Sequence, residues 1–254
     1  MVRKTGERPG WGSGYEYDES RHLLPYRYAA GLAEGLRVLD AGCGEGFGTQ
    51  ELAEVAAHVT GLDRAPDAVA FCRRRWRRPN LAFIAADLRS VHAVPVRFDL
   101  VCCFQVLEHQ RDDEGFLRRL ARLLLPGGTL VLTTPNVLRS FSENPHHVRE
   151  YRPEELRALL RRVFGEVTLL GVHGNAAVHA YDAARARAVR RVLALDPLGL
   201  RNRLPDRVVQ VAFPRLAAVV RRRTRRAGEA ITSSDFEVHG DDLDTALDLL
   251  AVCR

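Results

Sequence analysis

The stretch that decides the fold is Val38-Leu39-Asp40-Ala41-Gly42-Cys43-Gly44-Glu45-Gly46, where an apolar run ends on an acid and glycines follow at every second position. Glycine carries no Cβ, so a turn of this kind lets the backbone approach a ligand closely. A helix is expected directly after it, over residues 46–57, and its first N–H groups can meet polar or anionic groups. The dinucleotide fingerprint G-x-G-x-x-G is not met, because Phe47 and Thr49 occupy the positions of its third glycine.

Short apolar runs alternate with amphipathic stretches of helical period from residue 36 to about residue 172. Strands are expected at residues 36–40, 58–62, 81–85, 98–104, 129–134, 167–171 and 247–253. Further helices are expected at residues 66–76, 112–124 and 153–164. Strands that are apolar throughout, each followed by a helix, indicate a parallel sheet covered on both faces. We therefore predict an α/β fold with a Rossmann-like, doubly wound sheet.

Three later features suit a nucleotide-like ligand at the glycine turn. Asp63 ends the second expected strand 21 residues after Gly42, where a carboxylate can accept hydrogen bonds from both ribose hydroxyls. Asp87 follows the third strand, and the turn Pro126-Gly127-Gly128 precedes the fifth. A generic Rossmann domain that binds NAD is the alternative interpretation.

The pattern D-x-G-x-G-x-G, with these later blocks in the same order, resembles the class I S-adenosylmethionine-dependent methyltransferases. Over residues 36–172 the chain is similar to ubiquinone-type O-methyltransferases (methyltransferase type 11). Val106-Leu107-Glu108-His109, Thr134-Pro135-Asn136 and Asn144-Pro145-His146-His147-Val148-Arg149-Glu150 resemble a bacterial subgroup of glycan and sugar O-methyltransferases. The resemblance implies seven strands, mostly parallel with the last antiparallel, and S-adenosyl-L-methionine as cofactor.

The resemblance also assigns cofactor-binding residues. They are Asp40, Ala41, Gly42, Cys43, Gly44, Gly46, Asp63, Arg64, Ala86, Asp87, Leu88, Phe104 and Gln105. It implies that Asp40 meets the methionyl amino group of the cofactor, directly or through water, and that Asp87 takes part in adenine recognition. Gln105 departs from the family, which usually has an aromatic or acidic residue there.

Two histidines are the candidate catalytic bases, because a sugar hydroxyl is a poor nucleophile while it is protonated. His109 and His147 are expected at the carboxyl edge of the sheet, where ligands gather, and Glu108 adjoins the first of them. For either histidine, a structural role such as capping a helix is the alternative. A divalent cation could be held by Glu108, His109 and Asp235, which offer oxygen and imidazole ligands.

Three parts of the chain are predicted. Residues 1–35 are expected to form a lid segment and a helix over the cofactor site, residues 36–174 and 230–254 the methyltransferase core, and residues 175–229 a helical, arginine-rich insertion. Trp11, Tyr15 and Tyr17 suit either a mobile lid or a disordered tail. Arg21 and His22 lie just before a helix expected over residues 23–33, and they could contact the cofactor carboxylate or the acceptor, or could simply begin a solvated helix.

The arginines have several interpretations. Residues 215–226 suit a solvated helix end, a site for an anionic acceptor, or peripheral contact with an anionic membrane. No nucleic-acid partner is expected, since no aromatic residues alternate with these arginines. Lys4 is the only lysine among 38 basic residues, which indicates codon bias, so the net charge of +6 carries little weight. Five scattered cysteines and the lack of a signal peptide or an apolar span favour a soluble, cytoplasmic protein.

The leading functional hypothesis is O-methylation of a sugar or glycan-linked hydroxyl by in-line methyl transfer with a histidine base. The alternatives are methylation of a small-molecule natural product on a phenol, amine or carboxylate, and a non-catalytic cofactor-binding regulator. The sequence leaves the acceptor and the oligomeric state open.

Overall fold

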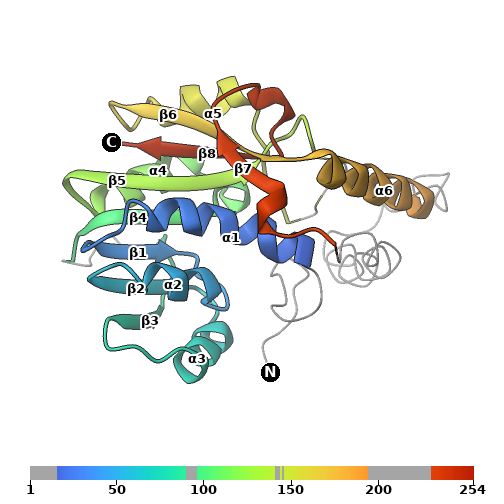
Figure 1. Cartoon of the computed structure of the whole chain (residues 1–254). Helices are drawn as coiled ribbons and strands as arrows, with labels where there is room; N and C mark the ends of the chain where they lie inside the picture. The colour runs from blue at the N-terminus through green and yellow to red at the C-terminus, as the bar shows by residue number, and fades with distance from the viewer. Residues whose placement is uncertain (1–15, 90–95, 141–143, 145, 194–229) are drawn as a thin grey trace.

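The computed structural model describes residues 16–89, 96–140, 144, 146–193 and 230–254 (Figure 1). Its helices are α1 (Glu16–Ala30), α2 (Phe47–Leu52), α3 (Pro66–Arg75), η2 (Leu107–His109), α4 (Asp113–Arg122), α5 (Pro153–Leu160), α6 (Ala176–Leu193), η4 (Ser233–Asp235) and η5 (Leu243–Thr245). Its strands are β1 (Arg37–Ala41), β2 (His58–Asp63), β3 (Leu81–Ala85), β4 (Phe98–Phe104), β5 (Leu124–Pro135), β6 (Val167–Gly174), β7 (Phe236–His239) and β8 (Asp248–Cys253). Trp11, Tyr15, residues 215–226 and most of the predicted insertion lie outside the described residues.

One mixed sheet with the strand order β3-β2-β1-β4-β5-β8-β6-β7 forms the centre of the molecule. Strands β1 to β6 run in one direction, and β8 is antiparallel to both of its neighbours, β5 and β6. The predicted doubly wound, mostly parallel α/β fold with an antiparallel last strand is therefore confirmed. Strand order reverses between β1 and β4, and in such sheets ligands bind beyond the carboxyl ends of the strands at that point.

The predicted number of seven strands is wrong, because β7 adds an eighth at the edge of the sheet, antiparallel to β6. This strand has four residues, of which only Phe236 and Val238 are apolar. Four residues are the shortest alternation that hydrophobic periodicity can identify as a strand, so the pattern was too short to stand out from its surroundings.

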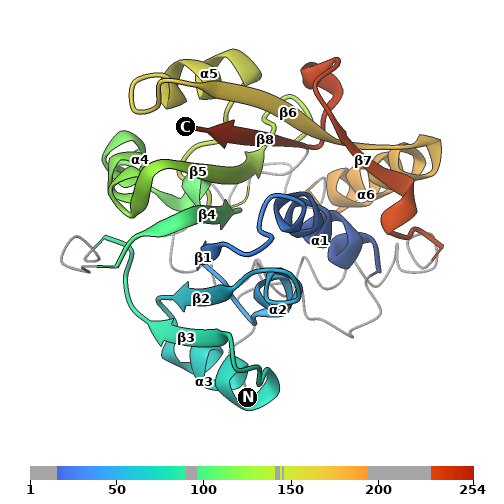
Figure 2. The ribbon, with the colours of Figure 1, turned by 60° about the vertical axis from the view of Figure 1, so that its left-hand side comes forward.

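Alternate residues of the strands belong to two separate cores on opposite faces of the sheet. The helices that cover the sheet can be followed in Figure 2. Leu39 and Val101 belong to the core under α4 and α5, whereas their neighbours Val38 and Leu100 belong to the core under α1 and α2. Because both faces are covered, strands β1 and β4 are apolar almost throughout, which is the pattern that predicted them.

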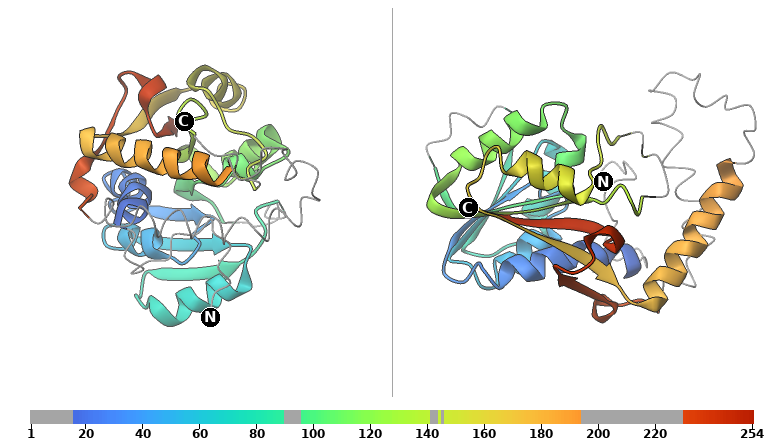
Figure 3. Two further views of the ribbon diagram at one scale, coloured as in Figure 1. Left: turned by 90° about the vertical axis from the view of Figure 1, so that its right-hand side faces the viewer. Right: turned by 90° about the horizontal axis from the view of Figure 1, so that it is seen from above.

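Helix α1 begins at Glu16, before the helix expected over residues 23–33, and Tyr17 is buried in it. The Tyr17 ring packs against Tyr181 and Phe236, and its hydroxyl donates to Asp182 at 2.6 Å. Tyr17 is thus a fixed contact between α1 and α6 and does not belong to a lid or a tail. Helix α6 follows β6 and extends beyond the end of the sheet (Figure 3).

Among the described residues, no helix combines the length and the apolar character that crossing a bilayer requires.

Candidate active site

The glycine turn lies between β1 and α2 and is held against β2. The backbone N–H groups of Gly42 and Cys43 donate to the carbonyl of Leu62 at 2.7 and 2.9 Å. Gly42, Gly44 and Gly46 have φ angles of 97°, 54° and 77°, in the left-handed region that favours glycine. A Cβ on Gly42 would lie 2.5 Å from the Cγ2 of Val106. The alternating glycines are therefore needed both for the turn and for the space beside it.

Asp63 closes the turn from the end of β2. Its carboxylate accepts hydrogen bonds from the N–H of Gly44 at 3.0 Å and from the N–H of Ala65 at 2.8 Å. The side chain also lines the main cavity of the molecule. This position fits the predicted role of a ribose acceptor, because an ionised carboxylate has further lone pairs available.

The structure places Asp40 behind the turn. It is fully buried and accepts hydrogen bonds from the hydroxyls of Thr49, at 2.6 Å, and Tyr26, at 3.2 Å. Burial raises the pKa of its carboxyl to about 7. Asp40 thus ties α1 and α2 to β1. Asp40, Ala41 and Gly46 do not line the cavity, so of the two predicted modes of contact between Asp40 and the cofactor this position favours the one through water.

The cavity has a volume of about 960 Å³, at the upper end of the range for small-molecule sites. The other predicted cofactor residues all line it: Gly42, Cys43, Gly44, Asp63, Arg64, Ala86, Asp87, Leu88, Phe104 and Gln105. They come from the carboxyl ends of β1 to β4, at the reversal of strand order. The residues that the sequence motif predicts therefore line the cavity, except for Asp40, Ala41 and Gly46, which lie behind its wall.

Two of these lining residues have distinctive local geometry. Asp87 is hydrogen-bonded by Arg89, which lowers the pKa of the carboxyl to about 2 and keeps it ionised. Gln105 has a φ of 55°, which is unusual for a residue other than glycine, and its side chain donates to the hydroxyl of Thr133 at 3.4 Å. Such backbone strain clusters at ligand sites.

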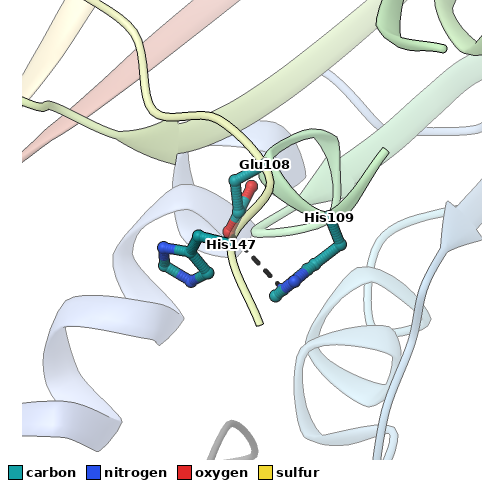
Figure 4. A group of neighbouring side chains, drawn as sticks. All are labelled: Glu108, His109 and His147. Carbon is teal, nitrogen blue, oxygen red and sulfur yellow. Dashed lines mark ion pairs between the residues drawn. The ribbon is translucent and has the colours of Figure 1, made fainter. Parts of the chain in front are cut away.

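Glu108, His109 and His147 lie together at the end of β4 (Figure 4), and the first two also come from one short helix, η2. One ligating atom from each lies within 4.8 Å of the others. Glu108 is 1% exposed, and burial raises the pKa of its carboxyl to about 8. Its Oε2 accepts from the hydroxyl of Thr134 at 3.2 Å. Its Oε1 has no hydrogen-bond partner among the described residues and lies 3.9 Å from the Nε2 of His109.

The hydrogen bonds place the proton of both neutral histidines on Nδ1, but the two Nε2 atoms have different surroundings. The Nδ1 of His109 lies 2.9 Å from the carbonyl of His146, and since a carbonyl only accepts, Nδ1 carries the proton and Nε2 is the basic nitrogen. His147 is held at both nitrogens, because Asn144 donates to its Nε2 at 2.9 Å and its Nδ1 donates to Glu150 at 2.7 Å. His109 is therefore the better placed base and His147 the more firmly fixed ring.

Asp235, predicted as a cation ligand, is not part of this group. Its carboxylate accepts from the N–H of Thr232 at 2.8 Å and from the side chain of Asn175 at 2.6 Å, so it caps η4 instead. It does not line the cavity. Spacing in the sequence could not reveal this, because residues 230–254 return to the sheet at a place that only the fold defines.

Arg21 and His22 do line the cavity, but protein groups already hold them. Arg21 donates twice to the carboxylate of Asp248, each time at 2.7 Å, and the Nδ1 of His22 lies 2.6 Å from the carbonyl of Asp18. Asn144 and Glu150 are the hydrogen-bond partners of His147, and nothing in residues 144–150 marks them as such before the loop is folded.

The glycine turn and Asp63 fit S-adenosylmethionine. A side chain at Gly42 would occupy the space that a cofactor needs in order to lie against the backbone of the turn. A doubly wound sheet with a cavity at its reversal of strand order is what the resemblance to class I methyltransferases implies. The family model described as "Methyltransferase domain" matches residues 32–168, more than half of the chain. The protein belongs to this family of S-adenosylmethionine-dependent methyltransferases.

Relatives and solved structures agree with this assignment. A probable S-adenosylmethionine-dependent methyltransferase of Mycobacterium tuberculosis is 31% identical, over 99% of this chain and 89% of its own. A ubiquinone biosynthesis O-methyltransferase of Methylocella silvestris is 38% identical over 48% of this chain and 51% of its own. The [4+2]-cyclase SpnF has a similar fold, with a TM-score of 0.58 and 22% identity over 98% of this chain and 85% of its own. The N-methyltransferase NodS of Bradyrhizobium japonicum, in complex with S-adenosyl-L-homocysteine, has a TM-score of 0.55 and 22% identity over 66% of this chain and 85% of its own.

Proposed function

We propose that this methyltransferase acts on a hydroxyl group and that His109 is the base that accepts the hydroxyl proton. The observation that carries the proposal is the geometry of His109, whose Nδ1 is fixed on the carbonyl of His146 while Nε2 lies beside Glu108 in the cavity. A sugar or glycan-linked hydroxyl is the preferred acceptor, on the strength of the sequence resemblance alone. Amines and carboxylates need no comparable base, so they are the weaker candidates for this geometry.

The cofactor, when bound, supplies an electrophilic methyl group on its sulfonium. The residues of the chain then have two tasks. Orienting the two reactants can lower the activation barrier by roughly 7–11 kcal/mol. The cavity walls formed by the glycine turn and η2 perform this orientation. A positioned base adds about 10²–10⁴-fold, and here Nε2 of His109 takes the proton. The positive imidazole that results favours the ionised form of the Glu108 carboxyl, whose Oε1 lies 3.9 Å away, and the two opposite charges then stabilise each other.

A divalent cation at the same three residues is a second candidate, favoured by the convergence of Glu108, His109 and His147. One carboxylate and two imidazoles suit transition metals such as zinc or manganese. In that case the cation rather than His109 would lower the pKa of the acceptor hydroxyl.

The base is tested with His109→Gln in a methyl-transfer assay with labelled cofactor and a panel of saccharides, nucleotide sugars and phenols. At saturating cofactor we expect turnover to fall by about 10²–10⁴-fold while affinity for the cofactor is retained. His58→Gln, an exposed histidine on β2, is the matched control and should retain full turnover. Unchanged turnover in His109→Gln would exclude a base at this position. Full activity after exhaustive chelation would exclude an exchangeable cation.

A further inference from the structure

The cavity extends well beyond the residues that the cofactor motif explains. One end is lined by the glycine turn and the ends of β2 and β3, and the other by residues of α1, by Arg185 of α6 and by the loop that follows β5. Glu108 and His109 lie on the wall between these ends. Since the first end holds the cofactor, the second is the end available to the methyl acceptor.

Three arginines line this second end, and two of them are neutralised by carboxylates. Arg21 pairs with Asp248 at 2.7 Å, and Arg185 pairs with Asp18 at 3.0 Å. Arg139 differs, because no carboxylate of the described residues lies within 4.0 Å of its guanidinium. Its side-chain hydrogen bond goes to the Nδ1 of His179 at 3.3 Å. A guanidinium only donates, so this nitrogen is the acceptor of the hydrogen bond.

The backbone of Arg139 is held firmly in place. Asn136, at the end of β5, is fully buried, and its side-chain amide donates to the carbonyls of Leu243 and Ala246 at 2.9 and 2.8 Å. The carbonyl of Asn136 in turn accepts from the N–H of Arg139 at 2.9 Å. The partly buried guanidinium is therefore presented to the cavity by a turn anchored in the core.

We propose that Arg139 binds an anionic oxygen group of the methyl acceptor, a carboxylate or a phosphate. The acceptor is then a hydroxyl compound that also carries an acid group, such as an acidic or phosphorylated sugar. A planar guanidinium binds two oxygens of such a group side by side, and partial burial strengthens the contact. The inference rests on the proposed hydroxyl chemistry and adds to it the part of the acceptor that is recognised.

The test measures binding without requiring turnover. Wild-type protein saturated with S-adenosyl-L-homocysteine is titrated by calorimetry with matched probes: glucose, glucuronate and glucose 6-phosphate, then catechol and 3,4-dihydroxybenzoate. We expect at least one acidic probe to bind about 10- to 100-fold more tightly than its neutral counterpart. The two acidic sugars distinguish a carboxylate from a phosphate. Arg139→Gln should abolish this preference, and Arg139→Lys, which keeps the charge but not the planar fork, should retain part of it.

The matched control is Arg74→Ala, which removes an exposed arginine of α3 outside this cavity and should leave the preference intact. Equal binding of acidic and neutral probes by the wild type would overturn the proposal. So would a preference that survives in Arg139→Gln, or a loss of S-adenosyl-L-homocysteine affinity in that variant, which would assign Arg139 to the cofactor. Efficient methylation of neutral acceptors by both proteins would overturn this inference and leave the proposed hydroxyl chemistry standing.

Discussion

Gly42 shows how a single residue type serves both the backbone and the ligand site. Its φ of 97° requires a residue without a Cβ, and the space beside its Cα is bounded by the side chain of Val106. The glycine pattern predicted close approach of the backbone correctly. It could not predict which neighbour sets the limit, because Val106 follows β4, far along the chain from the turn.

In Gly42→Ala, the loss of free energy of cofactor binding should exceed the loss of free energy of unfolding. Alanine in the left-handed region costs roughly 1–2 kcal/mol, and its Cβ must also displace Val106 at the cavity wall. Calorimetry with S-adenosyl-L-homocysteine should show an affinity loss of about 10-fold or more. The control Gly35→Ala has a φ of 70° with nothing within 4 Å of the added Cβ, so it should show the destabilisation alone. Equal affinity losses in the two variants would contradict the steric explanation.

At the scale of elements, the strands were predictable and the docking of α1 was not. The strands of the parallel part are apolar runs whose burial is dictated by the sheet itself. Helix α1 instead depends on polar contacts with segments more than 150 residues away, such as Tyr17 with Asp182 and Asp18 with Arg185. A polar side chain does not reveal its distant partner in the sequence, so Tyr17 resembled part of a glycine-rich tail.

The Tyr17 contact should be measurable as part of the free energy of unfolding. Tyr17→Phe keeps the ring but leaves the buried carboxylate of Asp182 without its 2.6 Å donor, which should cost about 1–3 kcal/mol. Tyr28→Phe is the matched control on the same helix, since the structure gives the Tyr28 hydroxyl no hydrogen bond within its described part. Urea unfolding of both variants gives the comparison. A cost in Tyr17→Phe no larger than in the control would show that the hydrogen bond contributes nothing to docking.

For the whole molecule, the candidate site was predicted as separate pieces whose assembly depends on the fold. The part of the cavity wall assigned to the cofactor was predictable, because it consists of local motifs at the ends of four consecutive strands, β1 to β4. The group of Glu108, His109 and His147 joins η2 to a loop nearly forty residues further on, and Arg139 owes its position to contacts with η5 and the start of β8. These segments come together only because of the order in which the strands lie side by side in the sheet.

The fold also buries two carboxyl groups in ways that make stability depend on pH. Burial raises the pKa of Asp40 to about 7 and that of Glu108 to about 8, so between their unfolded values and these values the folded protein binds more protons than the unfolded chain. Stability contributed by protonated Asp40 and Glu108 is therefore lost as pH rises, through about 7 and about 8 respectively. His173 acts in the opposite direction at lower pH, because burial lowers the pKa of its imidazole and protonation then opposes folding.

Between pH 6.5 and 8 we therefore expect the free energy of unfolding of the cofactor-free protein to decrease as pH rises. Because burial lowers the pKa of His173, its imidazole in the folded state is more neutral than protonated in this window. The buried cysteine thiols, whose pKa values burial raises, remain protonated in the folded state. Glu108→Gln should flatten the decrease between pH 7 and 8, whereas Asp40→Asn should flatten it mainly below pH 7. Urea unfolding at closely spaced pH values, with His58→Gln as a surface control, measures both slopes. A free energy of unfolding that rises across this window would contradict the predicted decrease. A slope that Glu108→Gln leaves unchanged would show that the buried carboxyl of Glu108 is not protonated in the folded protein.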